Sequence, residues 1–271
     1  MGFSVRPNRM GEDLLVRIPF IISELGLNAN GDIKLAKQMI DMAKECGCDA
    51  VKFQKRTVEK VYPKELLDSP RESPWGKTVR DQKMGLEFGK EEYDIIDAYC
   101  QKIGMPWFAS AWDLESQEFL RQYDLEYNKI ASPMLTNLEL LRMVASEGRH
   151  TFISTGMALN THIDSAVAIF KASNCPFTLM HCVSKYPCPD NACNLKAIPE
   201  LKAKYNCSVG YSNHSPGILA TSLAVLLGAE AIEVHVTLDR TLYGSDQAAS
   251  FERRGLEYVV RDARRVKEML G

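Results

Sequence analysis

Short apolar segments alternate with longer amphipathic segments from residue 19 to the end of the chain. In residues 33–46, Leu35, Met39 and Met42 recur at spacings of four and three, which is typical of a helix with one buried face. The apolar segments predict strands at 19–24, 50–54, 106–111, 128–132, 151–155, 177–183, 208–212 and 231–237. The amphipathic segments predict helices at 33–46, 91–103, 114–123, 137–147, 162–173, 198–205, 218–227 and 256–270.

Eight strands that are each followed by a helix predict an α/β fold of the (β/α)8 TIM-barrel class. The strands of a parallel barrel are buried on both faces and are therefore nearly continuous apolar runs, as most of these are. A doubly wound open sheet of about five or six strands is the alternative. Because the chain contains neither G-x-G-x-x-G nor G-x-x-x-x-G-K-[ST], we expect the barrel.

Two segments lie outside this alternation. Residues 1–17 form an N-terminal extension that could make a short hairpin closing the bottom of the barrel, and residues 18–271 are expected to form a single catalytic barrel domain. Residues 56–90 are a long, charged connection with three prolines and Trp75 after the second strand. A connection of this length in a compact domain is usually a lid or a binding loop.

Composition narrows the class of protein further. The 33 basic and 35 acidic residues give a net charge of −2, without the basic cluster that nucleic-acid binding requires. The longest apolar runs, such as 218–227, are far short of the ~20 residues that span a bilayer. Residues 1–17 have no apolar core, so we expect a cytoplasmic protein without a secretory signal. The eight cysteines match no tetrahedral zinc pattern and are expected to be free thiols.

Polar residues stand at nearly every predicted strand end, where a barrel places its catalytic groups. These residues are Glu24, Lys52, Gln54, Ser110, Lys129, Ser132, Ser154, Ser184, Ser212, His214 and His235. A lysine that ends a buried strand is costly unless an anion meets it, and Glu24 could neutralise only one of Lys52 and Lys129. Two lysines ringed by serines therefore predict a site for a small phosphorylated carboxylate.

His214 and His235 end the seventh and eighth predicted strands. Adjacent strands lie about 4.8 Å apart, so two imidazoles at one level can share a single cation. A lone histidine is more often a core residue, but two on neighbouring strand ends predict a metal site. Two protein ligands leave positions open for water and substrate, which is typical of a catalytic ion.

The chain resembles the sialic acid synthases, which condense phosphoenolpyruvate with N-acetylmannosamine, from Ile21 to Gly271. The resemblance rests on ISELGLN at 22–28, VKFQK at 51–55, WGKT at 75–78, KIAS at 129–132, STGM at 154–157, GYSNH at 210–214, EVHVTLD at 233–239 and GSD at 244–246. Each motif is short, but their order and spacing are together highly specific.

The resemblance implies a role for each of the polar residues. Phosphoenolpyruvate would be held by Lys52, Ser110, Lys129, Ser132, Ser154 and Ser212. A divalent cation, Mn²⁺ first and Mg²⁺ or Co²⁺ as alternatives, would bind His214 and His235. The sugar would meet Gln54, Tyr186 and Asp246, and Glu24 would contact the reacting centre. Glu24, Lys52 and Lys129 are thus the expected catalytic residues, and a homodimer is the expected assembly.

Three departures from the family concern the sugar. The family carries a C-terminal antifreeze-like domain that lends an arginine to the sugar site, and we expect this arginine to be missing here unless a separately encoded partner supplies it. Met134 stands where the family has an acidic sugar contact. Gln247 replaces a histidine and Ser184 an asparagine. Alternatives are therefore the same chemistry on another modified or phosphorylated aldose, or a non-catalytic barrel that binds a sugar acid or phosphoenolpyruvate.

Overall fold

Eight parallel strands close into a barrel in the computed structural model, which describes residues 18–270. The strands are β1 (Phe20–Glu24), β2 (Ala50–Lys55), β5 (Trp107–Ala111), β6 (Tyr127–Ile130), β7 (His150–Ser154), β8 (Phe177–Cys182), β9 (Ser208–Asn213) and β10 (Ala231–His235). Their order around the barrel is β1-β10-β9-β8-β7-β6-β5-β2. All eight predicted strands are confirmed, and the TIM-barrel fold with them. The expected hairpin in residues 1–17 lies outside the described residues.

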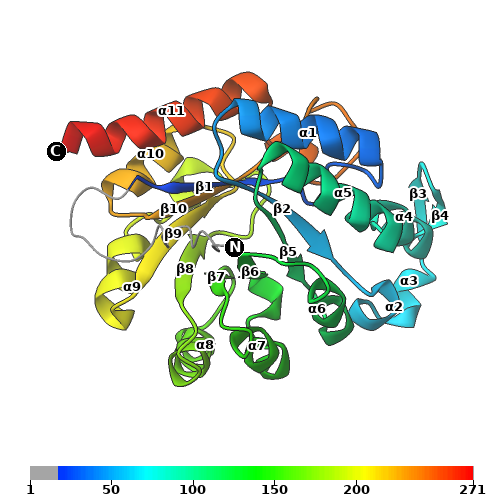
Figure 1. Ribbon diagram of the computed structural model, residues 1–271, viewed down its shortest axis with the longest axis horizontal. Helices are drawn as coiled ribbons and strands as arrows, with labels where there is room; N and C mark the ends of the chain where they lie inside the picture. The colour runs from blue at the N-terminus through cyan, green and yellow to red at the C-terminus, as the bar shows by residue number, and fades with distance from the viewer. Residues whose placement is uncertain (1–17, 271) are drawn as a thin grey trace, which may run out of the picture.

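A ring of helices surrounds the barrel (Figure 1). They are α1 (Ile33–Glu45), α5 (Lys90–Ile103), α6 (Leu114–Leu120), α7 (Leu138–Ala145), α8 (Asn160–Ala172), α9 (Ala197–Tyr205), α10 (Leu219–Leu226) and α11 (Arg253–Leu270). Short 3-10 helices follow three strands at η1 (Ser132–Met134), η2 (Asp190–Ala192) and η3 (Gln247–Ala249). None of the helices within residues 18–270 is long and apolar enough to cross a membrane.

Local sequence signals set where these helices begin and end. The Asp32 carboxylate accepts a hydrogen bond of 2.7 Å from the backbone N–H of Lys34 and so caps α1, satisfying a donor that the first turn leaves free. Met39 and Ile40 of α1 are buried against the barrel. At the end of α5, Gly104 adopts a left-handed conformation with φ 66°, which costs glycine little and stops the helix.

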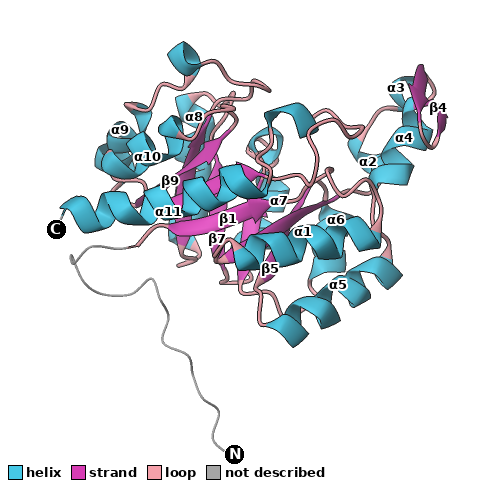
Figure 2. Ribbon diagram, turned by 90° about the horizontal axis from the view of Figure 1, so that it is seen from above, coloured by secondary structure: helices cyan, strands magenta, loops and turns pink. Residues whose placement is uncertain are grey.

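Residues 56–90 are not the plain loop that their composition indicates. They contain α2 (Val58–Val61), α3 (Lys64–Leu67), the antiparallel hairpin of β3 (Pro70–Ser73) and β4 (Gly76–Thr78), and α4 (Val79–Leu86). We call residues 56–90 the excursion; it projects to one side of the barrel (Figure 2). Val58, Leu67 and Val79 form a small hydrophobic cluster of its own, which explains why the segment is folded without extending the barrel.

The two ends of the barrel interior differ in chemistry. Phe20, Phe108, Tyr127 and Phe152, near the strand starts, pack with ring centroids 5.1–5.8 Å apart. Ser110, Lys129 and Ser154 lie two residues after Phe108, Tyr127 and Phe152 on the same strands. Alternate residues of a strand point to the same side, so an aromatic plug closes one end and polar groups face the other.

Candidate active site

Two lysines and two glutamates form a buried quartet at the carboxyl ends of the strands. Glu24 pairs in the sheet with Lys52 of β2 on one side and with His235 of β10 on the other. The Lys52 ammonium lies 2.5 Å from Glu24 Oε2, and the Lys129 ammonium lies 2.9 Å from Glu233 Oε2. Lys52 is also 3.8 Å from Glu233. All four side chains are at most 5% exposed.

Glu233 corrects the expectation that one of the two lysines lacks a partner. Both lysines are neutralised by carboxylates of the chain itself, so their burial does not by itself require a bound anion. Burial opposes the charge of Glu233, but Lys129 and Lys52 hold the pKa of its carboxyl well below the usual range. Likewise, Glu233 and Glu24 raise the pKa of Lys52 against the effect of burial. The quartet thus pairs two basic with two acidic side chains, so that their formal charges balance.

Serine hydroxyls surround the quartet as the sequence predicts. Lys129 donates a hydrogen bond of 2.8 Å to Ser154 Oγ, and Ser212 donates one of 3.1 Å to Glu233 Oε1. Ser110 is buried and lies in register with both Gln54 and Lys129. These hydroxyls can turn toward a bound anion because a hydroxyl both donates and accepts.

Ser132 lies beside a close backbone approach at Gly156. Ser132 was predicted to end the strand at 128–132. Strand β6 instead ends at Ile130, and Ser132 belongs to η1. The Gly156 N–H donates a hydrogen bond of 3.0 Å to Ser132 Oγ, which is 3.2 Å from the Cys182 sulfur. A Cβ at Gly156 would come within 2.6 Å of Ser184 Oγ and 2.9 Å of Ser132 Oγ. Only glycine keeps these polar atoms together.

Gln54 connects the quartet to the outer part of the site. Its side-chain amide donates a hydrogen bond of 2.6 Å to Glu24 Oε1. Gly26 has φ 47°, and a Cβ there would lie 2.5 Å from the same oxygen, so the turn after β1 requires glycine. The side-chain oxygen Oε1 of Gln54 accepts a hydrogen bond from Arg56, the first residue of the excursion. The predicted sugar residue therefore touches the predicted catalytic carboxylate.

The two histidines are neighbours at the end of β9 and β10, with ring centroids 5.4 Å apart. His214 Nδ1 donates a hydrogen bond of 2.6 Å to the carbonyl of Val183, which leaves Nε2 as the ring atom with a lone pair. Burial, aided by His235, lowers the pKa of His214 to about 4, so its imidazole is neutral at pH 7. His214 and His235 therefore have the donor chemistry of a metal site.

Other expected sugar residues surround this pair. Tyr186 is half exposed, stacks on His214 at a centroid distance of 4.1 Å and donates its hydroxyl hydrogen bond to Nε2 at 2.9 Å. An Asp246 carboxylate oxygen lies 3.5 Å from His235 Nδ1. Within residues 18–270 there is no group of three or more His, Cys, Asp or Glu side chains arranged to hold a metal. A cation would thus need ligands from water or substrate.

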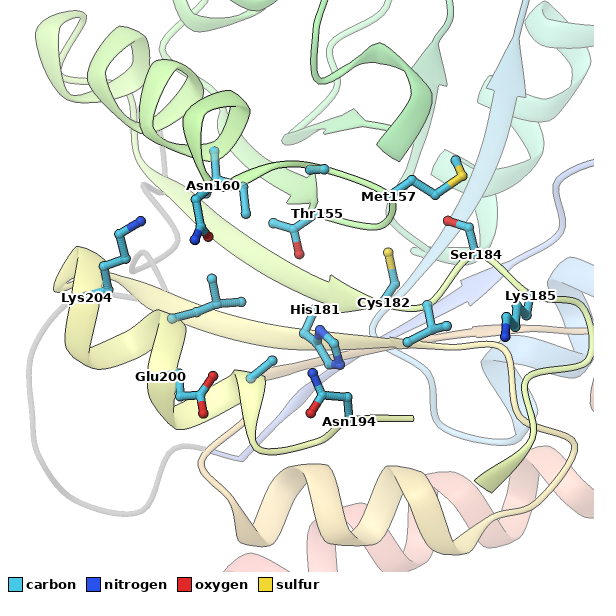
Figure 3. Close-up of a pocket in the computed structure, with 15 residues that line it drawn as sticks. Thr155, Met157, Asn160, His181, Cys182, Ser184, Lys185, Asn194, Glu200 and Lys204 are labelled. Atoms are coloured by element: carbon cyan, nitrogen blue, oxygen red, sulfur yellow. The ribbon is translucent and has the colours of Figure 1, made fainter. Parts of the chain in front are cut away.

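A cavity of about 550 Å³ opens beside the site, between α8, α9 and the end of β8 (Figure 3). Cys182 and Ser184 lie at one end of it, and Asn160 and Lys204 at the other. His181 faces it and has Nε2 2.9 Å from the carbonyl oxygen of Cys193. None of the quartet residues lines this cavity.

Comparisons with known proteins agree with this geometry. N-acetylneuraminate-9-phosphate synthase of Mus musculus is 39% identical over 255 residues, which cover 93% of this chain and 71% of that protein. N,N'-diacetyllegionaminic acid synthase of Campylobacter jejuni is 34% identical over 261 residues, which cover 93% of this chain and 77% of that protein. The crystal structure of the sialic acid synthetase of Leptospira borgpetersenii in complex with citrate matches with a TM-score of 0.85 and 38% identity, over 93% of this chain and 85% of that one. Residues 39–271 match the NeuB family, and the chain therefore belongs to the NeuB family.

Proposed function

We propose that this chain is a transferase that condenses phosphoenolpyruvate with an aminosugar aldose, giving a 2-keto-3-deoxy sugar acid and inorganic phosphate. The observation that carries the proposal is the buried quartet of Glu24, Lys52, Lys129 and Glu233 beside the imidazoles of His214 and His235. Relatives whose names denote synthases of neuraminate 9-phosphate and legionaminate support the same chemistry.

Lys52 and Lys129 provide the positive charge for the phosphate and carboxylate of phosphoenolpyruvate. Each lysine already has a carboxylate partner, so an incoming anion would share the ammonium groups and draw further hydrogen bonds from Ser154 and Ser212. Preorganised donors in a buried site stabilise developing charge more strongly than water does. Ser132 and the N–H of Gly156 would complete this cradle.

The reaction joins C3 of phosphoenolpyruvate to the aldehyde carbon of the open-chain sugar. Water then adds to C2 of the phosphoenolpyruvate moiety, and the C2–O bond to phosphate breaks to leave the keto group. Glu24, which is held by Lys52 and Gln54, would accept the proton of that water. Phosphoenolpyruvate, aldose and water thus yield the sugar acid and phosphate.

His214 and His235 would hold a divalent cation, for which manganese is our first expectation and magnesium or cobalt are alternatives. Such an ion, when bound, supplies Lewis-acid polarisation of a carbonyl oxygen. Tyr186 caps His214 Nε2 at 2.9 Å, so this hydroxyl would have to move aside or remain as a neighbour of the cation. Gln54, Tyr186 and Asp246 would position the sugar around the aldehyde.

Phosphate release from phosphoenolpyruvate tests the proposal. The assay combines the purified chain, Mn²⁺ and a panel of aldoses that includes N-acetylmannosamine, its 6-phosphate and a diacetylated hexosamine, with mass spectrometry of the product. The expected result is aldose-dependent phosphate release and a product with the combined mass. Tight binding of phosphoenolpyruvate without release for any aldose would instead support a non-catalytic binding barrel.

A further inference from the structure

Three segments that are far apart in the sequence meet beside the sugar side of the site. They are the turn after β1 at 25–32, helix α4 of the excursion, and residues 236–250 after β10, which we call the Asp246 loop. A Cβ at Gly31 would lie 2.1 Å from the carbonyl oxygen of Gly85 in α4. Because only a residue without a Cβ permits this approach, α4 packs directly against the turn after β1.

Tyr243 is the residue through which the Asp246 loop contacts both other segments. Its hydroxyl oxygen accepts a hydrogen bond of 2.8 Å from the side-chain amide of Gln82 on α4. Its ring meets the Trp75 indole edge to face, with centroids 5.6 Å apart. Its carbonyl oxygen accepts a hydrogen bond of 2.9 Å from the side-chain amide of Asn30 in the turn after β1. Tyr243 thus joins the loop to the excursion through its side chain and to the turn through its backbone.

The excursion holds the Tyr243 side chain with two of its elements. Gln82 of α4 is 5% exposed, and its Oε1 has no hydrogen-bond partner among residues 18–270, so the bond from Nε2 to Tyr243 compensates for burying the amide. Trp75 lies in the turn between β3 and β4. A Cβ at Gly85 would come within 2.1 Å of the Trp75 Cγ, so the indole reaches Tyr243 only because α4 has a glycine at this position.

The same loop reaches the histidines a few residues further along the chain. Asp246 Oδ2 lies 3.5 Å from His235 Nδ1. The next residue, Gln247, is 1% exposed and donates hydrogen bonds to the carbonyl oxygens of Tyr243 at 3.4 Å and Asn28 at 3.2 Å. Coupling between two sites is carried by such continuous hydrogen-bonded chains, so a displacement of Tyr243 would also displace Asp246.

We propose that Tyr243 is a positioning residue for the aminosugar: its side-chain contacts with the excursion hold the Asp246 loop where Asp246 meets the acceptor. The inference rests on the proposed function, because it takes Asp246 as a sugar residue. The phosphoenolpyruvate half of the site consists of the quartet and its serines, and none of the contacts of Tyr243 involves these residues. Tyr243 should therefore act on the aldose and leave phosphoenolpyruvate unaffected.

Steady-state kinetics of Tyr243→Phe test the inference, with the full chain, Mn²⁺, phosphoenolpyruvate and the aldose that the wild-type chain uses best. The variant keeps the ring beside Trp75 and loses only the hydroxyl. The KM for the aldose should rise about fivefold, as the loss of one hydrogen bond predicts, and the KM for phosphoenolpyruvate should not change. The kcat should also be unchanged, because a contact made equally in the ground state and the transition state affects KM alone.

Two further variants identify the bond that is responsible. Gln82→Met should raise the KM for the aldose as Tyr243→Phe does, and the double variant should be no worse than either single one, since both remove the same hydrogen bond. The matched control is Tyr258→Phe on α11, whose hydroxyl accepts a hydrogen bond of 3.0 Å from Arg254. It loses a comparable bond outside the three segments and should change neither KM.

An unchanged KM for the aldose in Tyr243→Phe, or an equal rise for both substrates, would overturn the inference while leaving the condensation intact. Additive effects of Tyr243→Phe and Gln82→Met would do the same. If no aldose supports phosphate release, the proposed function fails, and hydrogen–deuterium exchange still decides whether Tyr243 positions the loop. Exchange in residues 236–250 should then be faster in Tyr243→Phe than in the wild-type chain and in Tyr258→Phe; equal rates in all three would contradict the role of Tyr243.

Discussion

Replacing Glu233 with glutamine should expose how the quartet is held together. The amide keeps the size of the carboxylate and can still accept a hydrogen bond from Lys129, but the negative charge is lost. Lys52 retains the Glu24 carboxylate at 2.5 Å, whereas Lys129, 2% exposed, would lose its carboxylate partner and retain two neutral acceptors, the new amide oxygen and the Ser154 hydroxyl at 2.8 Å. Removing one partner of a buried ion pair costs about 3–5 kcal/mol. Because the amide keeps a hydrogen bond to Lys129, we expect the free energy of unfolding to fall by about 3 kcal/mol.

Urea unfolding of the wild-type chain and of Glu233→Gln, followed by circular dichroism, measures this loss. The control is Glu45→Gln, which removes an exposed ion pair with Arg253 and should cost at most about 1 kcal/mol. Glu233 has a pKa below its unfolded value of 4.5, so its contribution is complete above pH 4.5 and is lost as the pH falls through the folded pKa. The difference between wild type and Glu233→Gln should therefore shrink under acid conditions.

Phosphoenolpyruvate should partly rescue the same variant. With one carboxylate removed, the two lysines carry an uncompensated positive charge, so an anion that binds them stabilises Glu233→Gln more than wild type. A loss below about 1 kcal/mol, equal to that of Glu45→Gln, would refute the view that the quartet is an ion-paired unit. An equal effect of phosphoenolpyruvate on both proteins would refute its placement at the lysines.

Three further changes test the remaining parts of the site. Chelation of metal, or His214→Ala with His235→Ala, should abolish turnover while circular dichroism shows an intact fold; full activity of the double variant would remove the metal assignment. Lys129→Ala should raise the KM for phosphoenolpyruvate by the equivalent of about 2 kcal/mol or more, whereas Lys185→Ala, on the exposed loop after β8, should change it little, and equal effects would count against the anion site. Met134→Glu should raise kcat/KM for N-acetylmannosamine without altering phosphoenolpyruvate binding, as steady-state kinetics would reveal; an unchanged value would exclude Met134 as a specificity determinant.

The barrel could be predicted because its strands and helices have distinct hydrophobic periods. Strand ends were placed within two residues, since the apolar runs stop where the chain leaves the barrel. The internal structure of the excursion could not be predicted, because α2 and α3 are each four residues long and show no complete helical period. Its folding depends on the small cluster around Leu67, which no local pattern indicates.

The candidate site was predicted at the level of residue types but not of their pairing. His214 and His235 are recognisable because both end strands, and the structure brings their rings together. Glu233 was missed because it stands inside an apolar strand, between Ile232 and Val234. Its position two residues before His235 was the available signal, since residues two apart share a face of a strand. The contacts of Arg56 were equally hidden, because they depend on how the excursion folds back.

The fate of the oxygen atoms in the condensation tests the proposed chemistry most directly. The reaction is run in ¹⁸O-labelled water with phosphoenolpyruvate and the preferred aldose, and the phosphate and the sugar acid are both analysed by mass spectrometry. Water that adds at C2 leaves the released phosphate unlabelled, and we expect unlabelled phosphate together with one condensed product. Labelled phosphate accompanied by pyruvate, with no condensed product, would mean simple hydrolysis at phosphorus and would contradict the proposed function.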